Sequence, residues 1–331
     1  MKIAVDAMGG DNAPEAIVQG ALQAAAQIPQ ARVVLVGRRQ ELETLLGTSA
    51  GEIDIVDAPE VISGDDKPLM AIRRKRKSSL AVALSMLAEG EVQAVVTAGN
   101  TGAFMAGASL LVGRIPGINK PALAPVLPTM DGRGVIALDI GSTMDPKPEN
   151  MLQFAIMGSL YALTMFGIEQ PRVGLLNVGT EPEKGNDLTL KSYQMLSNSG
   201  AISFAGNVEA RDIMQGACDV LVCDGFTGNV LLKAMEGTAQ AIFAGIKEAV
   251  MTGGLRAKIG ALLLKPALKQ FRDKMDYAEH GGAPLLGING VCIKCHGSAD
   301  AKTVKNSILK QAWPLARDEV ITKISKQTGG N

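Results

Sequence analysis

The chain has 331 residues, of which 47% are hydrophobic and only 3% are aromatic, so Ala, Val, Leu, Ile and Met must fill its core. Lysine plus arginine and aspartate plus glutamate number 33 each, and this zero net charge argues against a general nucleic-acid-binding protein. Met1-Lys2 leads directly into a strand-like run, which predicts a cytoplasmic protein without a secretory signal.

Strand-like runs alternate with helix-like runs along the chain. The expected strands are residues 2–7, 32–37, 53–58, 94–99, 122–127, 135–140, 172–178, 202–205, 220–224 and 291–295. This alternation predicts an α/β fold, an α/β/α sandwich with a mainly parallel sheet. Residues 121–140 break the rhythm, because two strands flank a turn at 129–132, so we expect a hairpin and a mixed sheet. No linker or repeat is visible, which predicts one domain, 1–331, with a helical excursion at about 237–279.

Two uncharged stretches are long enough to compare with membrane spans. Residues 92–113 contain an Asn-Thr-Gly turn and are expected to form a strand followed by a helix. Residues 150–168 follow Pro148 and Glu149, as in the first turn of a soluble helix, and the helical pattern ends at Gly167. We therefore expect a fully buried helix there, shared in the interface of a homodimer.

The helical excursion is basic and amphipathic. It breaks at Gly253-Gly254, and residues 255–274 hold six cations against one acid, with leucines between them. Pro266 is expected to kink or end the second helix near Lys265. A basic amphipathic hairpin can lie on an anionic membrane or receive an acidic protein, although an ordinary surface helix has the same pattern. The residues expected at the membrane are Leu255, Lys258, Ile259, Leu262, Leu263 and Lys265.

Residues 2–14 carry a distinctive motif, in which a strand-like run is followed by a Met-Gly-Gly turn at residues 8–10. Asp11 or Asn12 is expected to cap a helix that has Pro14 in its first turn. A strand, a glycine turn and a capped helix leave several backbone N–H groups at one point, and such a point suits an anion.

This opening resembles that of the bacterial phosphate acyltransferases of phospholipid synthesis. The similarity recurs, in order, at residues 97–103, 138–141, 145–149, 174–179, 184–186, 206–212, 223–229, 281–290 and 296–298. It implies a fold like that of phosphotransacetylases and isopropylmalate dehydrogenase. It also implies transfer of a long-chain fatty acyl group from acyl carrier protein to inorganic phosphate, without a cofactor. The acyl phosphate would pass to a membrane-bound glycerol-3-phosphate acyltransferase at the inner face of the plasma membrane.

Attack of phosphate on a thioester needs a held dianion, donors for the developing oxyanion and an exit for the thiolate. Positioning and electrostatic stabilisation can supply these without a covalent acyl-enzyme. Accordingly, no Ser–His–Asp arrangement is recognisable, and the chain has only two histidines. Glycine-rich segments follow several predicted strands, and the carboxyl ends of parallel strands are where such sheets bind ligands.

Lys184 is the first catalytic candidate, because an ammonium in a polar loop after a strand can meet phosphate or the developing oxyanion. The resemblance favours this role, whereas composition alone would favour a solvated lysine. His296 also follows a strand, and its imidazole could bind phosphate, protonate the departing sulfur or be structural. Asp6 and Asp224 end strands, where each could orient a donor, act as a base or serve only as a turn or capping carboxylate.

Substrate and phosphate binding is expected from glycine amides, side-chain amides and hydroxyls on these loops. Helix capping is compatible with ligand binding at such positions. The candidates are Gly9, Gly10, Asn100, Thr101, Gly102, Asn186, Thr227, Gly228, Asn229 and Ser298.

The densest charge run is the candidate docking surface for acyl carrier protein, an acidic partner. It comprises Arg73, Arg74, Lys75, Arg76 and Lys77. The neutral overall charge makes nucleic-acid binding a weaker interpretation, and a solvated helix face is the plain alternative.

Cys292, Cys295 and His296 match the Cys-x-x-Cys-His pattern of haem attachment, but the run alternates like a strand. We therefore expect the two cysteines to be small core residues. A zinc site with Cys218 and Cys223 is disfavoured, because these residues straddle a helix-to-strand passage rather than a knuckle. No metal is predicted.

Three alternatives stay open. A coenzyme A-dependent small-acyl phosphate acyltransferase shares the fold and chemistry, but the basic run and the hairpin favour a protein-borne acyl chain. A nicotinamide dehydrogenase of the isopropylmalate type should show an Asp-x-x-x-Asp pair and a Gly-x-Gly-x-x-Gly turn, and the chain has neither. A non-catalytic peripheral membrane scaffold would bind lipid without turnover.

Overall fold

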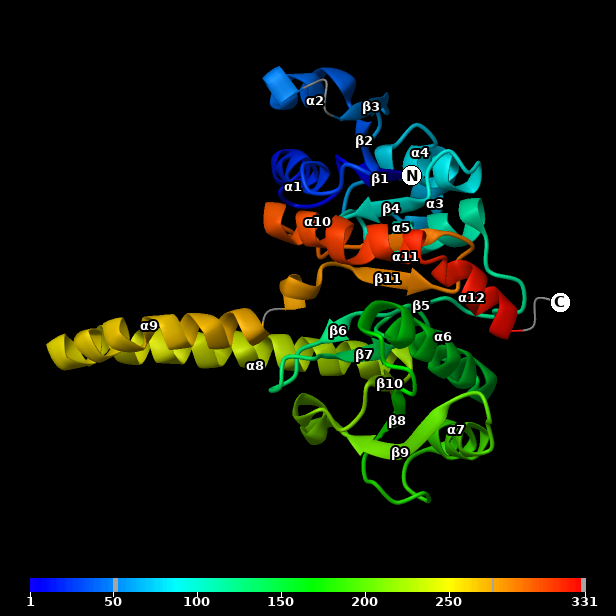
Figure 1. The fold of residues 1–331 in the computed structure, drawn as a ribbon, viewed down its shortest axis with the longest axis vertical. Helices are drawn as coiled ribbons and strands as arrows, with labels where there is room; N and C mark the ends of the chain where they lie inside the picture. Colours follow the sequence, from blue (N-terminus) through cyan, green and yellow to red (C-terminus); the bar gives the residue numbers. More distant parts are fainter. Residues whose placement is uncertain (50–52, 276, 329–331) are drawn as a thin grey trace.

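The computed structural model describes residues 1–49, 53–275 and 277–328 (Figure 1). Within this part of the chain, the strands form two mixed, mainly parallel sheets. The first has the order β3-β2-β1-β4-β12-β11-β5, made by β1 (Lys2–Asp6), β2 (Arg32–Gly37), β3 (Asp54–Asp57), β4 (Ala94–Thr97), β5 (Ala122–Leu123), β11 (Ala283–Leu286) and β12 (Val291–Lys294). The second has the order β6-β7-β10-β8-β9, made by β6 (Val126–Leu127), β7 (Val135–Leu138), β8 (Arg172–Asn177), β9 (Ser203–Glu209) and β10 (Val220–Val222). The predicted α/β class with a mainly parallel, mixed strand arrangement is confirmed.

The first sheet is parallel from β3 to β12 and antiparallel at β11 and β5. Every residue of β4 is buried, as expected for a strand with both faces covered. The chain runs from β1 outward to β2 and β3, then returns to place β4 on the other side of β1. The boundary between β1 and β4 is therefore a topological switch point, where open α/β sheets form ligand crevices.

The second sheet contains the expected hairpin, because β6 pairs antiparallel with β7. The single strand expected at residues 122–127 is wrong in detail, since β5 joins the first sheet and β6 the second. Strand β9 also extends to Glu209, beyond the expected residues 202–205. The sequence pattern misses β11, because its Ala-Pro-Leu-Leu sequence contains a proline, which is rare inside strands.

Helices cover the sheets. They are α1 (Glu15–Ala25), α2 (Arg39–Leu46), α3 (Pro68–Arg74), α4 (Ser79–Ala88), α5 (Thr101–Gly107), α6 (Pro148–Phe166), α7 (Asp187–Ser197), α8 (Gly225–Thr252), α9 (Gly254–Met275), α10 (Ala301–Ser307), α11 (Trp313–Arg317) and α12 (Val320–Gln327). Short π- or 3₁₀-helical segments include η2 (Ala108–Val112), η3 (Ala210–Gln215), η4 (Tyr277–His280) and η5 (Ile308–Ala312). Separate buried clusters contain Ile17 of α1 and Phe104 of α5, consistent with helices on both faces of the first sheet.

Helix α6 contains most of the uncharged stretch that was compared with a membrane span. Nine of the 19 residues of this helix are buried, and the Tyr161 hydroxyl donates a 2.5 Å hydrogen bond to the side chain of Gln311. Leu163 and Phe166 are nevertheless 40% and 38% exposed. Full burial is therefore wrong for the last turn, where these residues, three positions apart, share a face that the core does not cover. Among the described residues, no helix combines the length and apolar character needed to cross a membrane.

Helices α8 and α9 form the expected hairpin, which projects away from both sheets (Figure 1). The break falls at Gly253, but α8 already begins at Gly225, well before residue 237. Pro266 does not end α9, which continues to Met275. Proline removes the donor to the carbonyl of Leu262, and this segment is so exposed that water can take the donor's place.

Candidate active site

Asp6 lies at the carboxyl end of β1, beside the switch point, and is only 2% exposed. The Thr97 hydroxyl, at the end of β4, donates a 2.7 Å hydrogen bond to Asp6 Oδ2, and the backbone N–H of Met8 donates to Oδ1. Burial raises the pKa of Asp6, while hydrogen bonds from Ser79 and Thr97 act in the opposite direction. This enclosed geometry favours the role of orienting neighbouring loops over that of a base in contact with substrate.

The Gly9-Gly10 turn passes between the loops that follow β4 and β12. A Cβ at Gly9 would lie 2.5 Å from Asp6 Oδ2 and 2.8 Å from the Cα of Gly99. Gly10 has a φ of +114°, and a Cβ there would lie 2.8 Å from the Cβ of Ala98. Both positions therefore require glycine, because larger residues would push the turn away from the strand ends.

The loop after β12 closes over this turn. Its Gly297 carbonyl accepts a 2.8 Å hydrogen bond from the backbone N–H of Asp11, and the side-chain amide of Asn12 donates to the carbonyl of Ser298. His296 and Ser298 are exposed, and His296 Nδ1 lies 2.8 Å from Ser298 Oγ. Asp6, the two glycines, His296, Ser298 and the loop of residues 98–100 after β4 thus form one group around the end of the first sheet, which we call the first-sheet turns.

The expected cap of α1 is wrong. The helix begins at Glu15 with Pro14 at the N-cap position and no side-chain capping hydrogen bond. The amide of Asn12 is used instead to hold residues 298 and 299, more than 280 positions away in the chain. The local sequence pattern does not reveal this partner, because helix signals contain no information on such distant contacts.

Lys294 belongs to the first-sheet turns, although no sequence motif indicates it. It is the last residue of β12, is 6% exposed, and donates hydrogen bonds from Nζ to the carbonyls of Ala98 and Cys295. Burial lowers the pKa of Lys294, while electrostatic interactions with Cys295, Asp6 and Asp11 raise it. A lysine that directly follows the buried Val-Cys-Ile run and precedes the Cys-His-Gly turn was the available signal.

Asn100, Thr101 and Gly102 begin α5 directly after β4. The Asn100 side chain caps the helix, accepting from the N–H of Ala103 at 2.9 Å, and donates to the carbonyls of Ser63 and Gly64. Its amide is therefore already committed to the protein. Thr101 is exposed, and Gly102 packs against Pro68 at the start of α3.

A second group gathers at the carboxyl ends of β7 and β10. Asp224 caps α8 by accepting a 2.8 Å hydrogen bond from the N–H of Thr227. A Cβ at Gly228 would lie 2.2 Å from the carbonyl oxygen of Asp139, and a Cβ at Gly141 would lie 3.7 Å from Asn229. Thr227 and Asn229 are exposed at the first turn of α8, where they are available to a ligand.

Asp139 organises this second group, although the sequence motifs did not indicate it as a site residue. It is fully buried and accepts hydrogen bonds from the backbone N–H groups of Leu123, Ser142 and Thr143. Burial raises the pKa of Asp139, while its hydrogen bonds with Ser142, Thr143 and Leu123 lower it. Its signal was its place at the end of a predicted strand.

Lys184 and Asn186 lie in a third group, the loop between β8 and α7. Lys184 is exposed, and its ammonium forms no ion pair with any residue that the structure describes. Asn177, at the end of β8, holds the loop by donating to the Lys184 carbonyl at 3.0 Å. Asn186 caps α7 by accepting from the N–H of Thr189. Asn207 holds the same loop through Glu181, and its Oδ1 is buried without a partner among the described residues.

The charge run of residues 73–77 is not uniform. Arg73, Arg74, Arg76 and Lys77 are exposed. Lys75 instead turns inward, where it pairs with Asp66 at 2.5 Å and donates to the carbonyl of Val61. The hydrogen bond from Lys75 lowers the pKa of Asp66. Four of the five cations are thus exposed and accessible to a partner surface, whereas Lys75 stabilises the loop before α3.

The six side chains expected at the membrane, from Leu255 to Lys265, are all exposed on α9. Leu255, Leu262 and Leu263 are 75%, 69% and 76% exposed, so an apolar surface along the first half of α9 is left in solvent. Monomeric soluble proteins rarely expose large contiguous apolar patches, and such a patch points to a protein or membrane contact.

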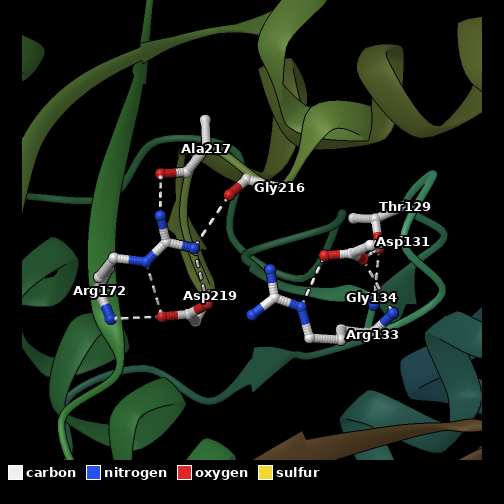
Figure 2. Close-up of polar contacts among 8 residues, drawn as sticks. All are labelled: Thr129, Asp131, Arg133, Gly134, Arg172, Gly216, Ala217 and Asp219. Carbon is white, nitrogen blue, oxygen red and sulfur yellow. Dashed lines mark hydrogen bonds and ion pairs between the residues drawn. The ribbon is translucent and has the colours of Figure 1, made fainter.

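A cavity of about 710 Å³ lies at the opposite, amino ends of β7, β8 and β10. Figure 2 shows that its arginines are already bonded: Arg172 holds Asp219 and the carbonyls of Gly216 and Ala217, and Arg133 holds Asp131. The Thr129 hydroxyl and Arg133 keep the pKa of Asp131 well below its usual range. Because this network is satisfied internally and contains no expected site residue, we place the candidate active site at the strand ends described above.

All four cysteines are buried and unbridged. Cys292 and Cys295 lie in and directly after β12, so their expected place in the core is confirmed. Burial raises the pKa of Cys292 and of Cys218 to about 12. These thiols are therefore protonated at neutral pH and are poor nucleophiles or ligands. No group of three or more His, Cys, Asp or Glu with metal-binding spacing occurs in the described ranges.

The two-sheet α/β architecture is similar to the fold of solved phosphotransacetylases. A phosphotransacetylase from Streptococcus pyogenes matches 96% of this chain and 94% of its own with a TM-score of 0.63, and the EutD phosphotransacetylase from Staphylococcus aureus matches the same shares with 0.60. Both are 14% identical, so they establish the fold alone.

The family model described as "Fatty acid synthesis protein" matches residues 1–323, and the chain belongs to this family. It is 51% identical over 334 residues to the phosphate acyltransferase of Brevibacillus brevis, covering 100% of this chain and 99% of the relative. It is 49% identical to that of Caldanaerobacter subterraneus, covering 99% and 97%. The resemblance inferred from the sequence motifs is confirmed.

Proposed function

We propose that this protein transfers a long-chain fatty acyl group from acyl carrier protein to inorganic phosphate, giving acyl phosphate for phosphatidic acid and phospholipid synthesis. The observation that carries the proposal is identity of about half of all residues, over the whole chain, with proteins named phosphate acyltransferase. A phosphate oxygen attacks the thioester carbon, the carbon–sulfur bond breaks, and the thiolate leaves with acyl carrier protein and takes up a proton.

The catalytic roles follow from exposure and charge. Lys184 presents an ammonium without an ion-pair partner among the described residues, suited to phosphate or to the developing oxyanion. His296, exposed beside Ser298, is placed to bind phosphate or to protonate the departing sulfur. Thr227 and Asn229 supply a hydroxyl and an amide, and Asp6 and Asp224 act through the loops they hold.

Direct transfer, without an acyl-enzyme, is supported by the state of the cysteines. All four thiols are buried, and burial raises their pKa values. A thiol is already a good leaving group, so holding phosphate against the thioester supplies most of what the reaction needs. This proposal requires a ternary complex and neither a metal nor an organic cofactor.

Acyl carrier protein is proposed to dock on Arg73, Arg74, Arg76 and Lys77. These cations surround the end of α3, and the start of the same helix packs on Gly102 of α5. An acidic carrier bound there would therefore lie one helix away from the turn after β4. Complementary charge would speed its association and make it sensitive to salt.

The exposed apolar surface of α9 is proposed to bind the inner face of the anionic plasma membrane. The rest of the protein is proposed to lie in the cytoplasm. The leucines of α9 enter the interface and Lys258 and Lys265 meet lipid phosphates. This contact would hold the acyl phosphate near the membrane-bound glycerol-3-phosphate acyltransferase that consumes it. The exposed face of α6 at Leu163 and Phe166 is proposed to contribute to a homodimer.

The test is thiol release from long-chain acyl carrier protein with and without inorganic phosphate, with acyl phosphate detected by mass. Phosphate-dependent release with that product is expected. Release only from acetyl coenzyme A would identify a small-acyl enzyme instead. Vesicle binding without release from either donor would identify a scaffold.

A further inference from the structure

Lys294 places a positive charge where the fold alone gains little from it. It ends the central strand β12, between β4 and β11, and its neighbours Val291, Cys292 and Ile293 are apolar and buried. The Lys294 side chain is a buried cation, at 6% exposure, and it interacts electrostatically with the buried carboxylate of Asp6. An ammonium in such a place is costly unless charges and acceptors surround it, so its presence calls for a reason.

The contacts of Lys294 connect two loops. Its Nζ donates to the carbonyl of Ala98, in the turn after β4, at 3.2 Å, and to the carbonyl of Cys295, in the turn after β12. Gly10 lies between these turns, since a Cβ there would lie 2.8 Å from Ala98 Cβ and 3.1 Å from the Gly297 oxygen. One ammonium thus fixes both walls that enclose the Gly9-Gly10 turn.

The same turns carry unused donors. Within the described ranges, the backbone N–H groups of Gly10, Asn100 and Gly297 have no hydrogen-bond acceptor in the protein. Half-buried N–H groups without an acceptor in the protein donate hydrogen bonds to water or to a ligand, and an anion is the ligand that suits such donors.

The charges at this place would otherwise repel an anion. Asp6 and Asp11 both act electrostatically on Lys294, and Lys294 in turn stabilises the ionised carboxylate of Asp6. Without the ammonium, the negative charges of Asp6 and Asp11 near these turns would lose the positive charge that offsets them. A phosphate dianion would then lose much of the favourable electrostatic energy that these donors supply.

We propose that Lys294 is a positioning residue for the phosphate acceptor: it fixes the turns after β4 and β12 and offsets the negative charge of Asp6 and Asp11, so that the free N–H groups of the first-sheet turns bind a phosphate dianion. The inference rests on the proposed function, in which inorganic phosphate is a substrate. It assigns phosphate to the first-sheet turns and thereby leaves Lys184 to the thioester oxygen.

The test measures inorganic phosphate binding and turnover separately, on the full-length protein. Thermal unfolding is followed in phosphate and in chloride of equal ionic strength, and the phosphate KM is compared with the KM for acyl carrier protein. The variants are Lys294→Met and the double variant Asp6→Asn/Lys294→Met. Lys326→Met, an exposed lysine on α12, is the matched control.

We expect phosphate to raise the unfolding temperature of the wild type and of the control, because a ligand that binds only the folded state stabilises it. Lys294→Met should weaken phosphate binding and raise the phosphate KM about tenfold or more, while the carrier KM changes less than about twofold. The double variant should recover thermal stability, because no unpaired buried carboxylate is left, but not phosphate affinity.

Unchanged phosphate binding by folded Lys294→Met, or an absence of phosphate binding by the wild type, would overturn the inference. So would full recovery of phosphate affinity in the double variant, since a purely structural charge pair predicts that recovery. Phosphate binding that depends on Lys294 in a wild type without acyl transfer would uphold the inference and reject the proposed function.

Discussion

The carboxylate of Asp6 accepts a 2.7 Å hydrogen bond from the hydroxyl of Thr97, which joins residues 91 positions apart and ties the carboxyl ends of β1 and β4 together at the switch point of the first sheet. Both side chains are buried, so the bond is shielded from water. The glycine turn and the loop after β4 are built on this pair, and the first-sheet turns depend on it.

Thr97→Val should therefore destabilise the protein while keeping its shape. The variant removes a buried donor and leaves Asp6 Oδ2 without it, a change that costs about 1–3 kcal/mol. Urea unfolding measures the loss, and Thr44→Val, an exposed threonine on α2, is the control. A loss no larger than that of the control would show that the bond contributes nothing to stability.

Stability should also depend on pH through Asp6. Burial raises the pKa of Asp6 above its ordinary value of 3.8. Between pH 3.8 and the raised pKa of the folded state, the folded chain therefore holds a proton that the unfolded chain has released. The contribution of Asp6 to the free energy of unfolding therefore falls as pH rises through this window. Asp6→Asn removes that contribution, so the stability of the wild type relative to the variant should decline from about pH 4 upward.

Urea unfolding of both proteins at a series of pH values measures this trend. Asp65→Asn, which changes an exposed carboxylate in the loop before α3, is the control. A difference between wild type and Asp6→Asn that stays constant with pH would contradict a raised pKa.

Gly10→Ala should disrupt the first-sheet turns. The φ of +114° disfavours any side chain, and the new Cβ would lie 2.8 Å from that of Ala98. We expect a loss of about 1–3 kcal/mol in unfolding free energy together with reduced phosphate-dependent activity. Gly64→Ala, where a Cβ meets nothing within 4 Å, is the matched control. Equal behaviour of the two variants would refute the close approach of the three loops.

Lys184→Met should lower kcat about 100-fold or more without unfolding the protein, because the ammonium is exposed and acts on developing charge rather than on packing. Thiol release and thermal unfolding give the two quantities. Lys191→Met, which changes an exposed lysine on the neighbouring α7, controls for loss of a cation. Normal turnover by Lys184→Met would remove this residue from the mechanism.

Leu262→Glu/Leu263→Glu should abolish binding to anionic phospholipid vesicles and leave catalysis with soluble substrates intact. The two side chains are 69% and 76% exposed on α9, which belongs to a hairpin that projects away from both sheets, so charges there oppose burial in lipid without entering the candidate site (Figure 1). Vesicle sedimentation measures binding, and Leu45→Glu on α2 is the control. Retained sedimentation of the double variant would exclude α9 as the membrane contact.

Within the charge run of residues 73–77, the exposed arginines and the paired Lys75 are expected to respond differently to substitution. Arg73→Glu/Arg74→Glu should raise the KM for acyl carrier protein about tenfold and weaken its salt dependence, because these exposed cations are proposed to meet an acidic surface. Lys75→Met should instead lower stability with little change in carrier KM, because Lys75 is paired with Asp66. The reverse pattern would place the docking surface elsewhere.

Much of the fold was predictable because its signals are local. Strands such as β4 are predicted by short apolar runs that end at glycines, and the hairpin of β6 and β7 is predicted by a turn between two such runs. The wrong predictions also have local causes. Pro284 argued against a strand at β11, and the uncharged sequence of α6 predicted a fully buried helix although its last turn is exposed. Division of the strands into two sheets depends on which distant strands pair, and no local pattern contains that information.

The sequence by itself determined the order of elements, the family and the chemical types available at the strand ends, because these depend on residue identity and short-range spacing. Only the tertiary structure decided what those residues do. It enclosed Asp6 and Lys294 in one buried group, turned Lys75 inward, committed Asn100 to capping and left Lys184 exposed. Burial and electrostatic environment arise from contacts between segments up to almost 300 residues apart, so the pKa values and free donors that make a site exist only once the chain has folded.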